Sequence, residues 1–174
     1  LLRDVARVTP GLRQTSLRPV PGLEEVRLHL ADEILPLWHA IQAATGDPDA
    51  PLPYWAFAWA GGLAIGRYLR EHPEVVAGRR VFDVASGSGL CAIAALHAGA
   101  VAATCADVDA FAAAAIELNA RANGRRVTVV HGDKVPIVPG FGQQPRFIVT
   151  IQPAGAVFNP PAPITLPNVD GLKP

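Results

Sequence analysis

The stretch that most constrains the fold is residues 81–89, with the sequence Val-Phe-Asp-Val-Ala-Ser-Gly-Ser-Gly. A short apolar run ends at an acidic residue, a turn of small residues follows, and an apolar segment begins directly after it. This is the pattern of a buried strand, a tight turn and a helix. Because the turn carries no large side chains, a nucleotide-like ligand can contact its backbone.

Strand and helix patterns continue to alternate after this turn. Residues 90–98 predict a helix rich in alanine, which ends at Gly99. Residues 101–106 predict a second strand, 111–122 a further helix and 126–131 a third strand. This βαβ alternation builds a parallel sheet with right-handed crossovers. We therefore predict an α/β fold: a Rossmann-like parallel sheet with flanking helices.

The part of the chain before residue 81 predicts a cover over the turn. Residues 25–30 alternate apolar and polar side chains, as a half-buried strand does. Apolar residues at helical spacing follow Ile34, and a second helical pattern after residue 62 stops at Pro73. We predict a flexible tail over residues 1–22 and a folded domain over 23–133.

An aromatic segment lies between these two helical patterns. Four of the eleven aromatic residues of the chain fall within residues 54–59, and Gly61 and Gly62 follow. Large aromatic side chains can form a hydrophobic plug over a core. They can equally form the apolar wall of a cofactor pocket, with the glycines allowing close approach of the backbone. The segment alone does not decide between these interpretations.

An acidic residue accompanies each of the three predicted strands near its carboxyl end: Asp83, Asp107 and Asp133. In an open parallel sheet, ligands bind outside these ends. An acid after the second strand can accept hydrogen bonds from both hydroxyls of a ribose, and one after the third can accept from an exocyclic amino group. An acid beside the turn can hold an ammonium group. Three carboxylates on one rim suit a ligand with hydroxyls and a positive charge.

Two cofactors compete for this description. Residues 87–92 satisfy the relaxed G-x-G-x-x-G/A dinucleotide fingerprint, and Asp107 has the spacing of the ribose acid. S-adenosylmethionine explains more, because Asp83 would repel a pyrophosphate and attract the ammonium of a methionine moiety. Asp133 has a role only with S-adenosylmethionine. Each aspartate taken singly could be an ordinary strand-end or helix-cap residue.

At these residues the sequence resembles the class I (seven-strand) S-adenosylmethionine-dependent methyltransferases. Residues 83–89 correspond to their first motif, in which Ala85 replaces the usual first glycine. Within that superfamily it most resembles the electron transfer flavoprotein β-subunit lysine methyltransferases and their bacterial, nicotinamide N-methyltransferase-like relatives. The resemblance covers roughly residues 22–133 and is carried further by residues 25–30, 53–62, 67–76 and 106–109 with Asn119, Asn123 and Gly124.

The resemblance implies methyl transfer to an amine, most plausibly a protein lysine, with the electron transfer flavoprotein β-subunit as a candidate protein substrate. It implies that Trp55 and Trp59 help to wall the pocket, that Asp107 binds the ribose, and that residues around Asp133 meet the adenine. No catalytic residue is assigned. The expected cofactor-binding residues are Trp55, Trp59, Asp83, Ala85, Ser86, Gly87, Gly89, Asp107, Val108 and Asp133.

Composition narrows the class of protein. Lys plus Arg equals Asp plus Glu at 15 each, which argues against a nucleic-acid or membrane-surface protein. No apolar run reaches the ~20 residues of a membrane span. Cys91 and Cys105 have no metal-type spacing and are expected to be buried thiols in a reducing compartment. We expect no metal site and a cytoplasmic location, or a mitochondrial one if the arginines of residues 1–22 belong to a targeting segment.

Residues 134–174 differ from the rest of the chain in composition and in periodicity. They are rich in proline, have no helical periodicity and contain nothing like the fourth-strand motif of the family. Residues 147–151 and 154–158 could form short strands, which the neighbouring prolines confine to edges. We therefore expect a sheet that is incomplete after the third strand. This leaves two alternatives to an active methyltransferase: a catalytically inactive S-adenosylmethionine-binding fragment and an NAD-dependent oxidoreductase.

Overall fold

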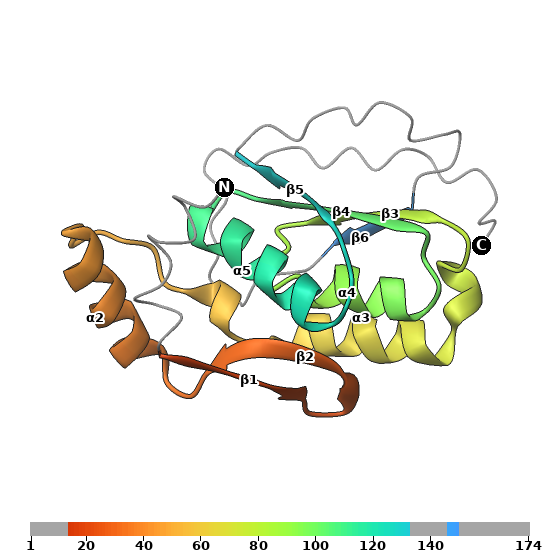
Figure 1. The fold of residues 1–174 in the computed structure, drawn as a ribbon, viewed down its shortest axis with the longest axis horizontal. Helices are drawn as coiled ribbons and strands as arrows, with labels where there is room; N and C mark the ends of the chain where they lie inside the picture. Colours follow the sequence, from red (N-terminus) through yellow and green to blue (C-terminus); the bar gives the residue numbers. More distant parts are fainter. Residues whose placement is uncertain (1–13, 133–145, 150–174) are drawn as a thin grey trace, which may run out of the picture.

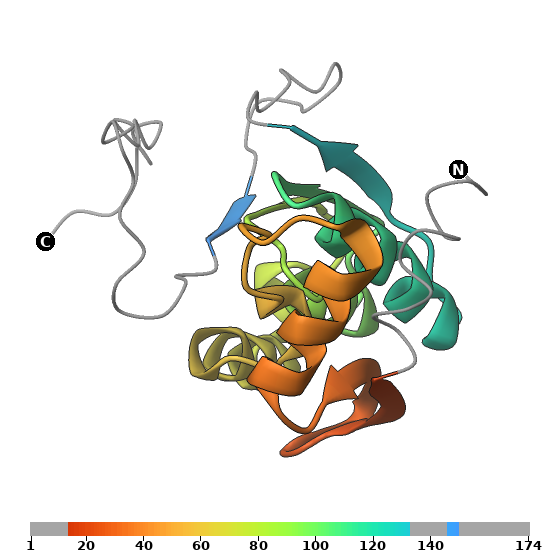
Figure 2. The ribbon, with the colours of Figure 1, turned by 90° about the vertical axis from the view of Figure 1, so that its left-hand side faces the viewer.

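A computed structural model describes residues 14–132 and 146–149 of the chain, and these residues form three layers (Figure 1). A four-stranded parallel sheet forms one side, helices form the middle, and a two-stranded antiparallel hairpin forms the other side. Figure 2 shows the same order from the side, with the hairpin separated from the sheet by the helices. The predicted α/β fold with a Rossmann-like parallel sheet is confirmed.

The parallel sheet consists of β3 (Arg80–Val84), β4 (Ala102–Asp107), β5 (Thr128–His131) and β6 (Arg146–Val149), in the order β5-β4-β3-β6. Every neighbouring pair is parallel. The chain moves outward from β3 to β5 and then returns to the other side of β3. This reversal creates a switch point at the carboxyl end of β3, which is the usual place for a ligand in such sheets.

Strand β6 corrects the expectation that the sheet stops after the third strand. Its backbone pairs with β3 from Val81 opposite Arg146 to Val84 opposite Val149. The run Phe-Ile-Val begins two residues after Pro145, so the proline precedes the strand and does not interrupt its hydrogen bonds. The second predicted strand of this region, over residues 154–158, lies outside the described residues.

Helices α4 (Leu90–His97) and α5 (Ala110–Ala122) cross between consecutive strands and cover one face of the sheet (Figure 1). Helix α4 is apolar on all sides because it lies between the sheet and the hairpin, and its first seven residues are buried. Helix α3 (Ala60–Glu71) packs beside α4. Gly62 permits a close approach between the two helices, since a Cβ at this residue would stand 3.1 Å from Leu90 Cδ2.

The hairpin of β1 (Thr15–Val20) and β2 (Leu23–Ala31) packs on the outer side of the helix layer (Figure 2). Strand β2 confirms the strand predicted over residues 25–30. The prediction of a flexible tail over residues 1–22 is wrong for β1. Pro19 lies within β1, because an edge strand tolerates a proline, and the register shifts between Pro19 and Val20.

The cover is completed by α2 (Ile34–Thr45) and two short 3₁₀ helices, η1 (Tyr54–Ala56) and η2 (Pro73–Val75). The helix predicted from Ile34 and the helix end predicted at Pro73 are both confirmed, since α3 stops at Glu71. Among the helices of the described part of the chain, none is both long and apolar enough to cross a membrane.

Candidate functional site

The turn that follows β3 contains three left-handed backbone positions at alternate residues. The φ angles are 54° at Ala85, 53° at Gly87 and 78° at Gly89. Glycine adopts such angles at little cost, whereas an L-residue pays about 1–2 kcal/mol. Ala85 is the one non-glycine residue with positive φ among the residues described. The position where the family has its first glycine is therefore a position whose backbone conformation favours glycine.

Ser86 joins the turn to the end of β4. Its hydroxyl donates to the Asp83 carbonyl oxygen at 2.8 Å and accepts from the Ala106 N–H at 3.1 Å. Its own N–H donates to the Ala106 carbonyl oxygen at 3.1 Å. The predicted cofactor-binding residue Ser86 thus uses its buried hydroxyl within the protein, and the Asp83 side chain is fully buried beside it in β3.

Asp107 stands at the carboxyl end of β4, beside the turn. Its Oδ2 accepts from the Gly87 N–H at 2.8 Å, and its Oδ1 accepts from the Asp109 N–H at 3.0 Å. A carboxylate has about four acceptor positions, so both oxygens can accept further hydrogen bonds. Asp107 is 9% exposed. Asp107, the acid after the second predicted strand, therefore contacts the turn directly, on the rim of the sheet where it was predicted to lie.

Val108 and Asp109 follow Asp107 at the carboxyl end of β4. Asp109 caps α5 by accepting from the Phe111 N–H at 2.8 Å. Burial raises the pKa of the Asp109 carboxyl, and the Asp107 carboxylate acts in the same direction. Val108 is 70% exposed, and its carbonyl oxygen lies 3.0 Å from Nε2 of His131 on β5. An exposed apolar side chain beside Asp107 suits contact with a flat, apolar ligand surface.

An open hollow lies between the turn and the aromatic segment, and its space, counted together with the open solvent at its mouth, is about 290 Å³. The turn forms one side of it, and Phe57 and Trp59 form part of the other. Trp59 is held by its Nε1–H, which donates to the Tyr54 carbonyl oxygen at 2.8 Å. The lining residues are Phe57, Trp59, Gly62, Ala85, Ser86, Gly87, Ser88, Leu90 and Cys91.

The two tryptophans of the aromatic segment occupy different places. Trp59 lines the hollow, as expected. Trp55 does not: its side chain is 1% exposed and packs in a core cluster with Leu37 and Ile41 of α2. Its backbone passes close to the turn, since a Cβ on Gly87 would lie 3.9 Å from Trp55 Cα. Trp55 is thus a plug in the core, and Trp59 forms part of the wall of the hollow.

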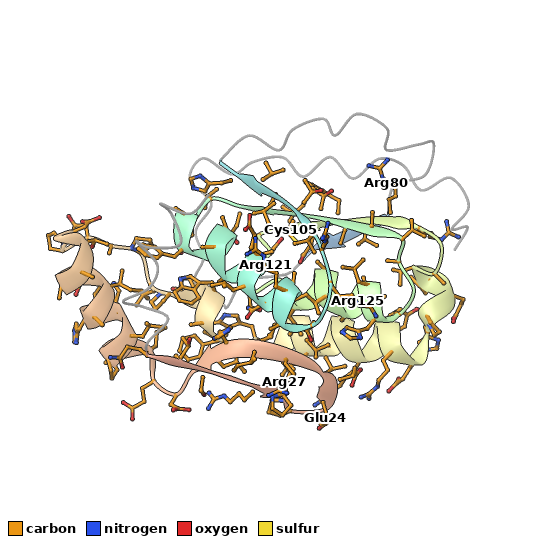
Figure 3. All side chains as sticks on the ribbon, in the orientation of Figure 1. Glu24, Arg27, Arg80, Cys105, Arg121 and Arg125 are labelled. Atoms are coloured by element: carbon orange, nitrogen blue, oxygen red, sulfur yellow. The ribbon has the colours of Figure 1, made fainter. Side chains whose placement is uncertain are left out.

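Several lining residues were not singled out in the sequence. Phe57 could have been found, because it belongs to the same aromatic run. Cys91 was expected only as a buried thiol, and it is buried while also lining the hollow. Cys105, labelled in Figure 3, lies on β4 in the core cluster between the sheet and α4, where burial raises the pKa of its thiol well above its ordinary value.

Asp133, the third predicted acid, lies outside the described residues. Among the residues that are described, no three His, Cys, Asp or Glu side chains gather as metal ligands would. Within the described ranges, the residues that line the hollow include no lysine or arginine, and the carboxylate of Asp107 lies beside the turn. This donor set fits a ligand with hydroxyls and an apolar or cationic part better than one with a pyrophosphate.

Residues 68–140 match the family described as Ribosomal protein L11 methyltransferase (PrmA). The electron transfer flavoprotein beta subunit lysine methyltransferase of Rattus norvegicus is 50% identical over 72 residues, which are 41% of this chain and 28% of that protein. The Xenopus laevis protein of the same name is 35% identical over 115 residues, or 66% of this chain and 46% of its own length. The chain thus spans less than half the length of either relative.

Among solved structures, a ribosomal protein L11 methylase from Lactobacillus delbrueckii subsp. bulgaricus is similar to this chain. The sequence identity is 29% and the TM-score is 0.38. The match covers 42% of this chain and 38% of that one.

Proposed function

Because residues 68–140 form part of a PrmA-like methyltransferase domain, we propose that the site at the end of β3 binds S-adenosylmethionine and serves methyl transfer to an amine. The observation that carries this proposal is the contact between Asp107 Oδ2 and the Gly87 N–H. It joins the acid after the second strand to the turn after the first, at the switch point of the sheet.

The residues present fit the cofactor in three respects. The small side chains of residues 85–88 leave the turn backbone accessible along the hollow. Asp107 has acceptor positions left for the two ribose hydroxyls. Phe57 and Trp59 supply an apolar wall on the other side of the hollow. Asp83, Ser86, Gly89 and Val108 remain predicted members of the site, and so does Asp133.

When bound, S-adenosylmethionine would supply its sulfonium methyl group to an amine nitrogen by in-line displacement: the N–C bond forms as the S–C bond breaks, S-adenosylhomocysteine leaves, and the amine loses one proton to solvent. The chain's own residues contribute orientation and exclusion of water. Asp107 would fix the ribose, and the turn would fix the part of the cofactor that lies over it. Phe57 and Trp59 would keep water from the methyl group.

For the acceptor we propose a protein lysine, and for the protein the electron transfer flavoprotein β-subunit, because the relatives named above carry that activity in their names. The proposed location is the cytoplasm, or the mitochondrial matrix if residues 1–22 include a targeting segment. Two alternatives stay open: a fragment that binds the cofactor and transfers nothing, and an NAD-dependent oxidoreductase based on the fingerprint of residues 87–92.

Titration calorimetry with S-adenosylhomocysteine and, separately, with NAD tests the cofactor. We expect the chain to bind S-adenosylhomocysteine and not NAD. Asp107→Ala should weaken this affinity at least about tenfold, since it removes a charged acceptor for two hydroxyls. Asp109→Ala is the matched control, because it removes a neighbouring carboxylate that caps α5 and has its own contact with Phe111.

Binding of NAD alone would contradict the methyltransferase assignment. An unchanged affinity for S-adenosylhomocysteine in Asp107→Ala would contradict the role of that residue. Methyl transfer is assayed separately with a labelled methyl donor and the electron transfer flavoprotein β-subunit. Cofactor binding without any methyl transfer would favour the inactive fragment.

A further inference from the structure

Asn119 on α5 and Asn123, the C-cap residue of that helix, face the edge of β2 that does not pair with β1. They are four residues apart, which on a helix is a rise of about 6 Å. Their partners on β2, His29 and Arg27, are two residues apart, which on a strand is about 6.8 Å. The two spacings match, so consecutive turns of α5 can pair with alternate residues of β2. Figure 3 shows Arg27 on the hairpin and Arg121 above it on α5.

Asn123 directs its amide mainly to the hairpin. Its Oδ1 accepts from the Arg27 N–H at 2.8 Å, and its Nδ2 donates to the Arg27 carbonyl oxygen at 2.6 Å. Its Nδ2 also donates to the carbonyl oxygen of Asn119 within α5, at 2.7 Å. The Asn123 amide thus pairs with the N–H and the carbonyl oxygen of Arg27, as the backbone of a neighbouring strand would.

Asn119 divides its amide between two elements. Its Oδ1 accepts from the His29 N–H at 2.8 Å, as the equivalent atom of Asn123 does from Arg27. Its Nδ2 instead donates to the Ser88 carbonyl oxygen in the turn at 2.9 Å. Asn119 is 0% exposed, so water cannot replace either contact without the protein opening.

The end of the turn that leads into α4 makes a second contact with α5. Ser88 precedes Gly89, which is the N-cap residue of α4. Gly89 packs against Ile116, which lies on α5 one helical turn before Asn119. A Cβ on Gly89 would meet Ile116 Cγ2 at 3.3 Å. Helix α5 therefore holds the far end of the turn by one apolar contact and one hydrogen bond.

We infer that Asn119 is a positioning residue that couples the docking of the β1–β2 hairpin to the conformation of the turn at residues 84–89. A hairpin held at His29 orients the Asn119 amide, and the oriented amide holds the Ser88 carbonyl. Because coupling between sites is reciprocal, a ligand on the turn stabilises the docked hairpin to the extent that the hairpin favours ligand binding. The ligand part of this inference rests on the proposed function, whereas the coupling itself does not.

Amide hydrogen exchange of the ligand-free 174-residue chain tests the coupling, with Asn119→Ala compared to Asn123→Ala. Both variants lose contacts to β2, but only the first loses the contact to the turn. We expect Asn119→Ala to speed exchange at Gly87 and Gly89 by roughly tenfold or more, since a buried hydrogen bond is lost. Asn123→Ala should speed exchange at Arg27 and leave the two turn amides within about twofold of wild type.

Asn119→Asp separates the two halves of the contact and serves if the alanine variant does not fold. When it is ionised, its carboxylate can still accept from the His29 N–H but cannot donate to the Ser88 carbonyl, so exchange is measured over a pH series that includes the ionised form. It should therefore keep the His29 amide protected and lose the protection of Gly87 and Gly89. Turn amides that exchange at the wild-type rate in the folded Asn119 variants, or equally fast in both alanine variants, would overturn the inference.

Titration with S-adenosylhomocysteine gives the ligand part of the test. Asn119→Ala should lower the affinity about tenfold and Asn123→Ala less than about threefold, since only the first frees the turn. Equal losses of affinity in the two variants would make Asn119 a structural residue only. If the wild-type chain binds no S-adenosylhomocysteine, the proposed function fails, and the exchange rates still decide whether the coupling exists.

Discussion

The two walls of the candidate site are built by different forces. The turn at residues 84–89 is held by hydrogen bonds from buried side chains, namely Ser86 and Asp107 on the side of the sheet and Asn119 on the side of the helices. The aromatic wall at residues 54–59 is held by burial of apolar surface, above all that of Trp55. The turn is positioned mainly by directional contacts and the aromatic segment mainly by packing, to which Trp59 adds one hydrogen bond to the Tyr54 carbonyl oxygen.

This difference predicts which substitutions change the stability of the protein and which change the geometry of the site. Packing is worth several kcal/mol at a large side chain and is insensitive to direction. A hydrogen bond contributes less but fixes an atom in place. Substitutions in the aromatic wall should therefore act on stability according to burial, and substitutions in the turn should act on the geometry that a ligand meets.

The largest effect is expected from Trp55→Ala, which should destabilise the protein by about 3–5 kcal/mol, because it leaves a cavity among buried residues. Trp59→Ala is the matched control on the same segment. It should cost less stability because Trp59 is half-buried, but it should weaken S-adenosylhomocysteine binding. Urea unfolding and calorimetry measure the two effects. A greater loss of stability in Trp59→Ala than in Trp55→Ala would reverse the assignment of plug and wall.

Ser86→Ala should destabilise the protein by about 1–3 kcal/mol, because the Ala106 N–H and the Asp83 carbonyl lose a buried partner. Ser16→Ala, on the exposed surface of β1, should stay within about 0.5 kcal/mol of wild type in the same urea unfolding experiment. Two indistinguishable unfolding curves for these variants would show that the turn is not held by the Ser86 hydroxyl.

Ala85→Gly should stabilise the protein by about 0.5–1 kcal/mol, because the relief of a left-handed alanine exceeds the entropy that a glycine adds to the unfolded chain. Ala114→Gly, inside α5, makes the same chemical change in a helical residue and should destabilise by about 1 kcal/mol. Thermal unfolding of both variants gives the signs. A loss of stability in Ala85→Gly would mean that the turn is not strained at this residue.

The smallest effect is expected in the pH dependence of stability at Asp109. Because burial raises its pKa in the folded protein, the folded state holds this proton more tightly than the unfolded state does. Its contribution to stability is therefore most favourable below the unfolded pKa of about 3.9 and is lost as the pH rises through the folded pKa.

Asp109→Asn keeps an acceptor for the cap of α5 and removes this titration. The variant should gain stability relative to wild type on going from pH 3 to pH 7, as followed by thermal unfolding across that range. A difference in stability between the two proteins that is independent of pH would contradict the raised pKa.

The strands and helices of residues 80–131 could be predicted because their pattern is local. Apolar runs of fixed length alternate with helical periodicity, and glycine marks the ends. The place of Asp107 beside the turn followed from the topology of parallel sheets alone. These predictions needed no knowledge of which side chains meet.

Other features depend on contacts between distant residues and were missed for that reason. The sequence treats Trp55 and Trp59 alike, and only the packing of α2 against Trp55 makes one a plug. Strand β1 owes its existence to β2, against which Pro19 is tolerated at an edge. The division of the Asn119 amide between His29 and Ser88 joins residues 90 and 31 positions away, which no periodicity reveals.

The most direct test of the central claim is a crystal structure of the 174-residue chain with S-adenosylhomocysteine. The account predicts that both ribose hydroxyls lie within hydrogen-bonding distance of the Asp107 carboxylate. It also predicts that the homocysteine part lies over residues 85–88, facing Phe57 and Trp59. A ligand bound elsewhere, or one whose ribose does not contact Asp107, would contradict the account.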